Sequence, residues 1–295
     1  MLTNRTFVEK GHYVVGRRKS LEWARMRSPS PRGLIFVPPL IGGSLAQQVS
    51  SFRSLIRREY DLVSFNYSGH GSSSDQFSLG ATIRDTFHML THTYSLCQKE
   101  QLPLFGIASC YSAIPILYAV HHLAEPLKGL VLINAIPNLS PRAVMRSFLA
   151  YYRRVFPTKR SLRRGMFAAK NYVEYLFPGI VKSKDYFGTL ERGRTRLFRT
   201  ISEFFTLNPL EGVRLQGTPV LCLYARQDMV LEIYDAGVGP SYEKDIRRTC
   251  PQALFHSLDG DHFISLPTAK GEILRHINSF FQSSFQAEEF SSARQ

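Results

Sequence analysis

The sequence predicts an α/β protein in which a mostly parallel sheet is flanked by helices and interrupted by an inserted helical cap. Short, continuous apolar runs, typical of strands buried on both faces, alternate along the chain with longer amphipathic segments typical of helices. Strands that alternate with helices are joined by right-handed crossovers, and they therefore form a mostly parallel sheet. The chain has 295 residues, which suffices for one large α/β domain with its own core.

The elements of the first half follow from this alternation. In order they are a hairpin with strands at 7–15 and 21–26, a strand at 33–37, a helix at 45–58, a strand at 61–67, a helix at 81–98, a strand up to 109 with a helix after it, and a strand at 129–133. Pro38 and Pro39 end the third strand. Pro115 falls within the first turn of its helix, where its missing N–H has no intrahelical partner to lose.

The second half begins with a break in the alternation. We expect residues 1–139 to form the first part of the core, 140–205 a helical, basic and aromatic cap, 206–282 the second part of the core, and 283–295 a frayed tail. The second part of the core contains strands at 218–224 and 253–258 and a closing amphipathic helix at 270–282.

The positive charge is concentrated in the expected cap. The chain carries 37 Lys or Arg against 23 Asp or Glu, a net +14, and residues 140–200 hold 15 of these basic residues against three acids. Such a field attracts anionic partners. The candidate partner-binding residues within it are Arg153, Arg154, Arg163 and Arg164.

The turn after the strand ending at 109 is a candidate site for a nucleophile. A nucleophile on a sharp strand-to-helix turn needs small residues two positions before and two positions after it. Centring the turn on Cys110 places Ala108 and Ser112 there, whereas centring it on Ser109 or on Ser112 places larger side chains. Centring it on Ala108 fits but provides no nucleophile. We therefore predict that Cys110 is the nucleophile; the alternative is a tight turn in which it is a small buried hydrophobe.

A base and an orienting acid are expected at the same edge of the sheet, in the chain order nucleophile, acid, base. Asp228 and His262 each follow the end of a predicted strand and satisfy this order. Asp235 and Glu232 remain alternatives for the acid. The other candidate histidines fit less well because they lie inside predicted elements or before the nucleophile: His256, His276 and His70.

We expect no metal and no cofactor. His88 and His92 are four residues apart on a predicted helix, as a metal pair would be, but Met89 stands where the zinc-protease pattern needs Glu. A packed or solvated helix face is the favoured interpretation.

The expected oxyanion hole uses two backbone N–H groups. One belongs to Tyr111, the residue after the nucleophile, and the other comes from the loop after the strand at 33–37. Because Pro38 and Pro39 have no N–H, Leu40 is the first residue of that loop that can donate.

The order of these motifs resembles the α/β-hydrolase superfamily across residues 30–282. The motifs are Phe36-Val37-Pro38-Pro39-Leu40, Asn66-Tyr67-Ser68-Gly69-His70-Gly71-Ser72-Ser73, the turn at 107–113, Arg226-Gln227-Asp228 and Gly260-Asp261-His262. The turn itself is similar to that of the acyl-carrier-protein thioesterase/acyltransferases of bacterial bioluminescence, which also carries Ala and Ser where most relatives carry Gly. Two departures are Pro38-Pro39 in place of the usual His-Gly and Cys110 in place of Ser.

A cysteine nucleophile favours activated acyl donors. Attack on a thioester exchanges one thioester for another at nearly even energy, whereas attack on an unactivated ester or amide runs uphill. We therefore expect acyl transfer or hydrolysis from an acyl thioester of coenzyme A or acyl carrier protein, whose anionic carriers suit the basic cap. The alternatives are a carboxylic ester or lactone hydrolase, and a non-catalytic ligand binder or peripheral protein on an anionic membrane surface. No nucleic-acid partner is expected.

The four cysteines, Cys97, Cys110, Cys222 and Cys250, show neither disulfide-framework nor zinc spacing. We also find no secretory signal at the N-terminus and no run near the roughly 20 apolar residues that span a bilayer. These features predict a reduced, cytoplasmic setting.

Overall fold

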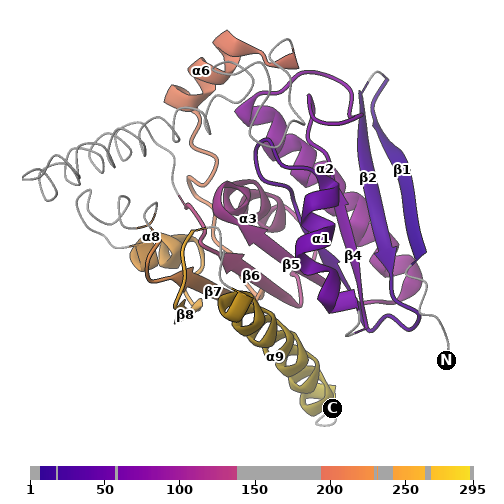
Figure 1. Ribbon diagram of the computed structural model, residues 1–295, viewed down its shortest axis with the longest axis vertical. Coiled ribbons are helices and arrows are strands. Elements are labelled where there is room, and N and C mark those ends of the chain that lie inside the picture. Colours follow the sequence, from indigo (N-terminus) through magenta and orange to yellow (C-terminus); the bar gives the residue numbers. More distant parts are fainter. Residues whose placement is uncertain are drawn as a thin grey trace, which may run out of the picture.

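A computed structural model describes residues 7–17, 19–56, 59–137, 194–228, 231, 242–262 and 267–292. Within these ranges one sheet of eight strands has the order β1-β2-β4-β3-β5-β6-β7-β8 (Figure 1). The strands are β1 (Phe7–Val15), β2 (Lys19–Arg27), β3 (Gly33–Phe36), β4 (Tyr60–Phe65), β5 (Leu104–Ser109), β6 (Gly129–Ile133), β7 (Val220–Ala225) and β8 (Leu254–Leu258). The helices are α1 (Leu45–Ile56), α2 (Leu79–Glu100), α3 (Ala113–His121), α6 (Leu197–Thr206), α8 (Tyr242–Thr249) and α9 (Pro267–Ser292), with a 3-10 turn η1 (Cys110–Ser112).

The sheet is mostly parallel, as the alternation of elements predicts. Strand β2 pairs antiparallel with β1 on one side and with β4 on the other, and every pairing from β4 through β3, β5, β6 and β7 to β8 is parallel. The carboxyl ends of the parallel strands therefore lie at one edge of the sheet, where ligands bind in open α/β sheets.

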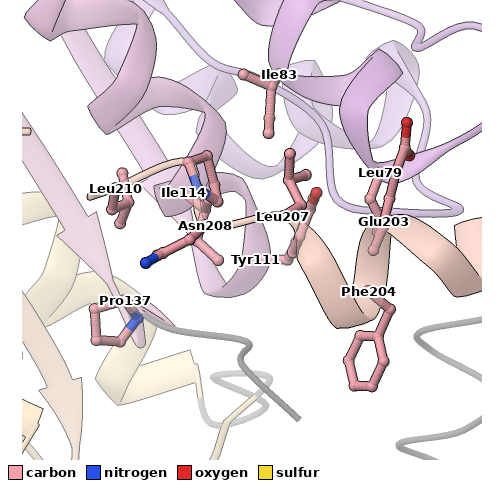
Figure 2. A pocket seen from close by; sticks show the side chains of 11 residues that line it. Leu79, Ile83, Tyr111, Ile114, Pro137, Glu203, Phe204, Leu207, Asn208 and Leu210 are labelled. Carbon is pink, nitrogen blue, oxygen red and sulfur yellow. The ribbon is translucent and has the colours of Figure 1, made fainter. Parts of the chain in front are cut away.

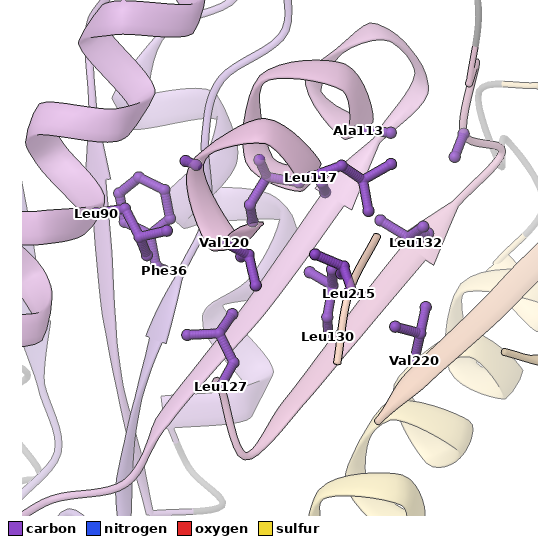
Figure 3. Close-up of a cluster of buried hydrophobic side chains, with 14 of the residues drawn as sticks. Phe36, Leu90, Ala113, Leu117, Val120, Leu127, Leu130, Leu132, Leu215 and Val220 are labelled. Carbon is purple, nitrogen blue, oxygen red and sulfur yellow. The ribbon is translucent and has the colours of Figure 1, made fainter. Parts of the chain in front are cut away.

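Both faces of the sheet are buried, which explains why β3 and β6 carry no polar side chain. On β3, Leu34 and Phe36 belong to a buried cluster with residues of α2 and α3 on one face (Figure 3). Ile35 belongs to a second cluster with residues of α1 and α9 on the other face. This alternation follows from the two-residue period of a strand. Each fully buried side chain of this size contributes about 1.5–3 kcal/mol.

Helix α2 is longer than the sequence suggested because local caps set its ends. The side chain of Ser78 accepts a hydrogen bond from the Ala81 N–H at the start, and Gln101, with φ of +55°, closes the other end in the left-handed region. Position Pro115 is the third residue of α3, which confirms that it lies in the first turn.

The C-terminal segment differs from the expected frayed tail. Helix α9 continues from the predicted closing helix through Ser292. Phe285 packs within 5.4 Å of the Phe105 ring of β5, and the Arg32 guanidinium lies 5.2 Å above the Phe285 ring. No Gly or Pro interrupts residues 272–292. The added apolar contact and the uninterrupted sequence explain why the helix continues.

Most of the expected cap at 140–205 lies outside the described residues; its last part contains α6. This part docks on the segment that follows β4, through a parallel bridge between Phe77 and Thr195 and a 2.7 Å hydrogen bond from Arg194 Nη1 to the Gly71 carbonyl. In the part of the chain that the structure describes, no helix combines the length and apolar character needed to cross a membrane.

Candidate active site

Cys110 stands on a strained turn directly after β5, one of the two middle strands of the parallel part of the sheet. Its φ of +50° lies in the left-handed region that L-residues rarely adopt. The residues two positions away, Ala108 and Ser112, are both buried. The Ser112 hydroxyl accepts from the Ser109 N–H at 2.9 Å and donates to the Ser109 carbonyl at 2.8 Å, so this small side chain also closes the turn.

Three of the predicted site residues lie in one hydrogen-bonded row. The Nε2 atom of His262 lies 3.1 Å from the Cys110 sulfur, and its Nδ1 lies 2.7 Å from Asp228 Oδ2. Asp228 follows β7, and its second carboxylate oxygen accepts from the Leu231 N–H at 3.1 Å. The row is thus assembled from the ends of β5, β7 and β8.

The charge state of the row is set by its own members. Burial opposes the charged form of His262, but its interactions with Cys110 and Asp228 outweigh burial and raise the His262 pKa to about 10. The imidazole is therefore protonated at neutral pH, and a protonated imidazole beside a cysteine sulfur is the arrangement that in general favours the nucleophilic thiolate.

The structure describes both expected oxyanion donors. Tyr111 belongs to the same apolar cluster as Cys110, and the partly buried Leu40 packs against that cluster. The Tyr111 N–H is at the start of η1, where a 3-10 turn provides no acceptor for its first amides. In the described part of the chain no acceptor bonds the Leu40 N–H either. Both amides are therefore available to a developing oxyanion.

Side chains from β4 and the segment after it hold the loop that carries Leu40. Ser64 Oγ donates to the Val37 carbonyl at 2.8 Å, Asn66 Oδ1 accepts from the Leu45 N–H at 2.9 Å, and His70 Nε2 accepts from the Gly42 N–H at 2.9 Å. His70 Nδ1 lies 3.2 Å from the Ser68 carbonyl, so the neutral ring with its proton on Nδ1 satisfies both contacts.

The sequence did not predict that His70 holds the loop with Leu40, because His70 was considered only as a candidate base. It is fully buried. Burial lowers the pKa of His70 to about 4; the Arg194 charge adds to this effect and the Ser68 carbonyl opposes it. The sequence feature that could have indicated this role is the position of His70 within residues 66–73. These residues directly follow a parallel strand and therefore lie at the edge of the sheet that carries Cys110.

A small apolar cavity, about 30 Å³, opens beside Tyr111 (Figure 2). Its walls come from α2, the start of α3, and α6 with the residues after it. The lining side chains include Leu79, Ile83, Ile114, Phe204, Leu207 and Leu210. One charged group, Glu203, also lines it, accepting from the Gly80 N–H at 2.7 Å and pairing with Arg199 at 2.7 Å. The cavity is lined by Tyr111, the residue after Cys110, and Cys110 itself is not part of its lining.

Several predicted residues lie outside the described ranges: Arg153, Arg154, Arg163, Arg164 and the alternative acids Glu232 and Asp235. Among the residues that the structure places, no three His, Cys, Asp or Glu side chains gather into a metal site. His92 packs instead against the Tyr13 and Trp23 rings at 4.5 and 5.3 Å.

Comparisons with known proteins support the fold. No protein-family model and no curated protein matches the sequence. A soluble variant of the Saccharomyces cerevisiae monoglyceride lipase, solved with a substrate analog, superposes with a TM-score of 0.63 at 14% identity over 96% of this chain and 97% of that one. A thermostable carboxyl esterase from Bacillus coagulans gives 0.62 at 12% identity over 94% and 98%. An enol-lactonase from Burkholderia xenovorans gives 0.55 at 13% identity over 92% and 100%.

At these identities the likeness shows the fold alone. The protein has the α/β-hydrolase fold, with a Cys, a His and an Asp in a hydrogen-bonded row at the carboxyl edge of the sheet. The narrower likeness of its turn to the bioluminescence acyltransferases stays a prediction.

Alkylation tests the reactivity of Cys110. Burial raises the pKa of Cys97 and of Cys250 to about 12 and that of Cys222 well above its usual value. Limiting iodoacetamide at pH 7 should therefore modify Cys110 first, as read by peptide mass spectrometry. His262→Ala should slow this reaction roughly tenfold, because the imidazolium partner of the thiolate is lost.

The matched control is His256→Ala, which removes an exposed histidine of β8. It should leave the alkylation rate unchanged. Equal modification of all four cysteines, or a rate that does not respond to His262→Ala, contradicts the assignment.

The neutral state of His70 predicts a loss of stability in acid. Between its unfolded pKa of 6.5 and its folded pKa of about 4, the unfolded chain binds a proton that the folded protein does not. The free energy of unfolding should therefore fall by up to about 3 kcal/mol over this interval as pH drops, with no contribution from His70 above it.

Urea titrations of wild type and His70→Gln at pH 4 to 7.5 measure this effect. The glutamine is neutral throughout, so the variant should lack this part of the pH dependence, while His256→Gln should retain it. Parallel curves for wild type and His70→Gln would exclude a buried neutral His70.

Proposed function

We propose that the protein transfers or hydrolyses acyl groups through a covalent thioester on Cys110. The row from Asp228 through His262 to Cys110, with spacings of 2.7 and 3.1 Å, is the observation that carries this proposal. A nucleophile, a base and an orienting acid in this geometry are the working parts of an acyl-transfer site.

The reaction follows from the charge state of the row. The Cys110 thiolate attacks the acyl carbonyl, and the resulting oxyanion accepts hydrogen bonds from the Leu40 and Tyr111 amides. His262 gives its Nε2 proton to the leaving group as the tetrahedral carbon collapses to a thioester on Cys110. It then takes a proton from the acceptor, which attacks this thioester and releases Cys110 as thiolate. Asp228 orients the ring through Nδ1 and stabilises its charge in both steps.

An acyl thioester is the substrate class that this chemistry favours. Transfer from one thioester to another leaves the acyl group activated, so it then passes to water, an alcohol, an amine or a thiol. The small cavity beside Tyr111, lined mainly by apolar side chains, is the place where a small aliphatic part of the substrate would lie.

A carboxylic ester or lactone is the second candidate donor. The structural neighbours favour it, because the proteins described above are a monoglyceride lipase, a carboxyl esterase and an enol-lactonase. A strained lactone offsets the unfavourable exchange of an ester for a thioester.

The carrier of the acyl group is proposed from charge. Residues 140–200 hold 15 basic residues against three acids. Coenzyme A and acyl carrier protein are both anionic and both present the acyl group as a phosphopantetheine thioester. An anionic membrane surface is the alternative partner of the same charge, and it is distinguished below.

Covalent capture tests the reaction. Wild type mixed with an acyl thioester should gain the mass of one acyl group on Cys110, and Cys110→Ala should gain none. Cys110→Ala and His262→Ala should each abolish turnover, and the double variant should be little worse than either, because members of one catalytic unit are non-additive.

The same experiment with an ester and a lactone separates the donor classes. A faster adduct from the thioester supports the first candidate, and an adduct from ester or lactone alone supports the second. Independent, multiplying losses in the two single variants contradict the row as one unit. If none of the donors forms an adduct, the result contradicts an enzymatic role. The ligand-binding or peripheral role then remains.

Salt tests the proposed anionic carrier. Surface charge acts mainly on association and is screened over about 8 Å at physiological ionic strength. Raising the salt concentration should therefore raise KM for an acyl-coenzyme A and leave kcat unchanged. The quadruple variant Arg153→Glu, Arg154→Glu, Arg163→Glu, Arg164→Glu should likewise raise KM for an acyl-coenzyme A and leave kcat unchanged.

A small neutral thioester is the matched control, since its KM should respond to neither change. Equal responses of both substrates contradict a carrier site. Release of the charge-reversed variant from anionic vesicles in sedimentation, without a change in KM, identifies a membrane-binding role instead.

A further inference from the structure

One buried amide connects the loops that carry the acid and the base of the candidate site. Asn134 directly follows β6 and is 2% exposed. Its Oδ1 accepts from the Ala225 N–H, at the end of β7, at 2.8 Å. Its Nδ2 donates to the His262 carbonyl at 2.9 Å and lies 3.5 Å from the Asp261 carbonyl.

The same short segment also reaches the nucleophile and the sheet. The Asn134 N–H donates to the Leu223 carbonyl of β7 at 2.9 Å, and the Ile136 N–H donates to the Cys110 carbonyl at 3.0 Å. Residues 134–136 therefore contact each of the three chain segments that carry Cys110, Asp228 and His262.

The two side-chain hydrogen bonds at position 134 require a side chain with the donor and acceptor groups of asparagine. Ala225 presents a donor and His262 presents an acceptor, so the side chain has to accept at one end and donate at the other. An amide does both without charge. The φ of Asn134 is +45°, a left-handed conformation that Asn tolerates better than most residues.

We infer that Asn134 is a positioning residue, which sets the distance between His262 and Cys110 by joining the base loop to the end of β7. It does not touch the substrate. The backbone joins the loop with His262 to the segment after β7 through the Gln227 N–H, which donates to the Gly260 carbonyl at 3.1 Å, and Asn134 adds a second link from the end of β6. This role rests on the proposed function of the row, and the experiments below separate the two.

The first variant is Asn134→Gly. Glycine adopts φ of +45° without strain, so the change deletes both side-chain hydrogen bonds and keeps the backbone conformation. The alkylation rate of Cys110 at pH 7 should drop to that of His262→Ala. If the variant also turns over an acyl substrate, kcat should fall about a hundredfold with KM nearly unchanged, the size of effect expected from misplacing a reacting group by about 1 Å.

The second variant, Asn134→Asp, provides a readout that a purely structural role does not move. A protonated carboxyl donates to the His262 carbonyl and accepts from the Ala225 N–H, as the amide does. An ionised carboxylate has no proton to donate and repels the carbonyl. The ratio of its Cys110 alkylation rate to the wild-type rate should therefore be near one in acid and fall at least tenfold as the carboxyl ionises.

Several other titratable groups surround position 134. Dividing the alkylation rate of the variant by the wild-type rate at the same pH removes their contribution. The acid and base loops bring Asp228, Asp261 and His262, and helix α8 brings Tyr242, which interacts with the backbone of Ala135. These groups are present in both proteins. The control is Asn278→Asp, a change at another buried asparagine on α9, and its ratio should stay constant with pH.

The outcomes decide the inference. A folded Asn134→Gly with a wild-type alkylation rate overturns it, as does an Asn134→Asp ratio that stays constant or rises with pH. If Asn134→Gly does not fold by circular dichroism, the Asn134→Asp profile alone decides. If the alkylation rates follow the expectation while wild type forms no acyl adduct, the proposed function fails and the positioning role of Asn134 stands.

Discussion

The left-handed backbone at Cys110 is the constraint on which the candidate site depends. It turns the chain from β5 into η1 within one residue, so the sulfur stands at the end of the strand and the Tyr111 N–H has no acceptor within the turn. The close approach around the turn admits only small neighbours, which Ala108 and Ser112 provide. The Ser112 hydroxyl stabilises the turn further through two hydrogen bonds to Ser109.

The parallel sheet brings the other parts of the site to this turn. Strands β3, β6, β7 and β8 end at the same edge as β5, so the segments that follow them supply Leu40, Asn134, Asp228 and His262. Polar side chains then fix the loops, because irregular backbone has no ladder of its own. Ser64, Asn66 and His70 hold the loop after β3, and Asn134 joins the segments after β7 and β8.

Two buried histidines near this edge are in opposite charge states, and their partners explain the difference. His70 contacts a carbonyl and an amide N–H, neither of which offsets the loss of hydration of a cation, so burial lowers its pKa to about 4. His262 lies between the Cys110 sulfur and the Asp228 carboxylate, whose electrostatic and hydrogen-bonding interactions outweigh burial and raise its pKa to about 10. The first ring holds a loop in the neutral form, and the second is protonated between its two partners.

The fold class and most element positions could be predicted from the sequence, because the apolar period of strands and helices is a local property. Small residues at the turn and the chain order also led to Cys110, Asp228 and His262, which the structure places in one hydrogen-bonded row. Other features depend on contacts between distant segments. The continuation of α9 depends on Phe285 packing against β5, and the roles of His70 and Asn134 depend on backbone groups of strands distant in the sequence. The hydrogen-bond partner of a buried polar side chain depends on which loop packs over it. This contact leaves no pattern in the neighbouring sequence from which it could be predicted.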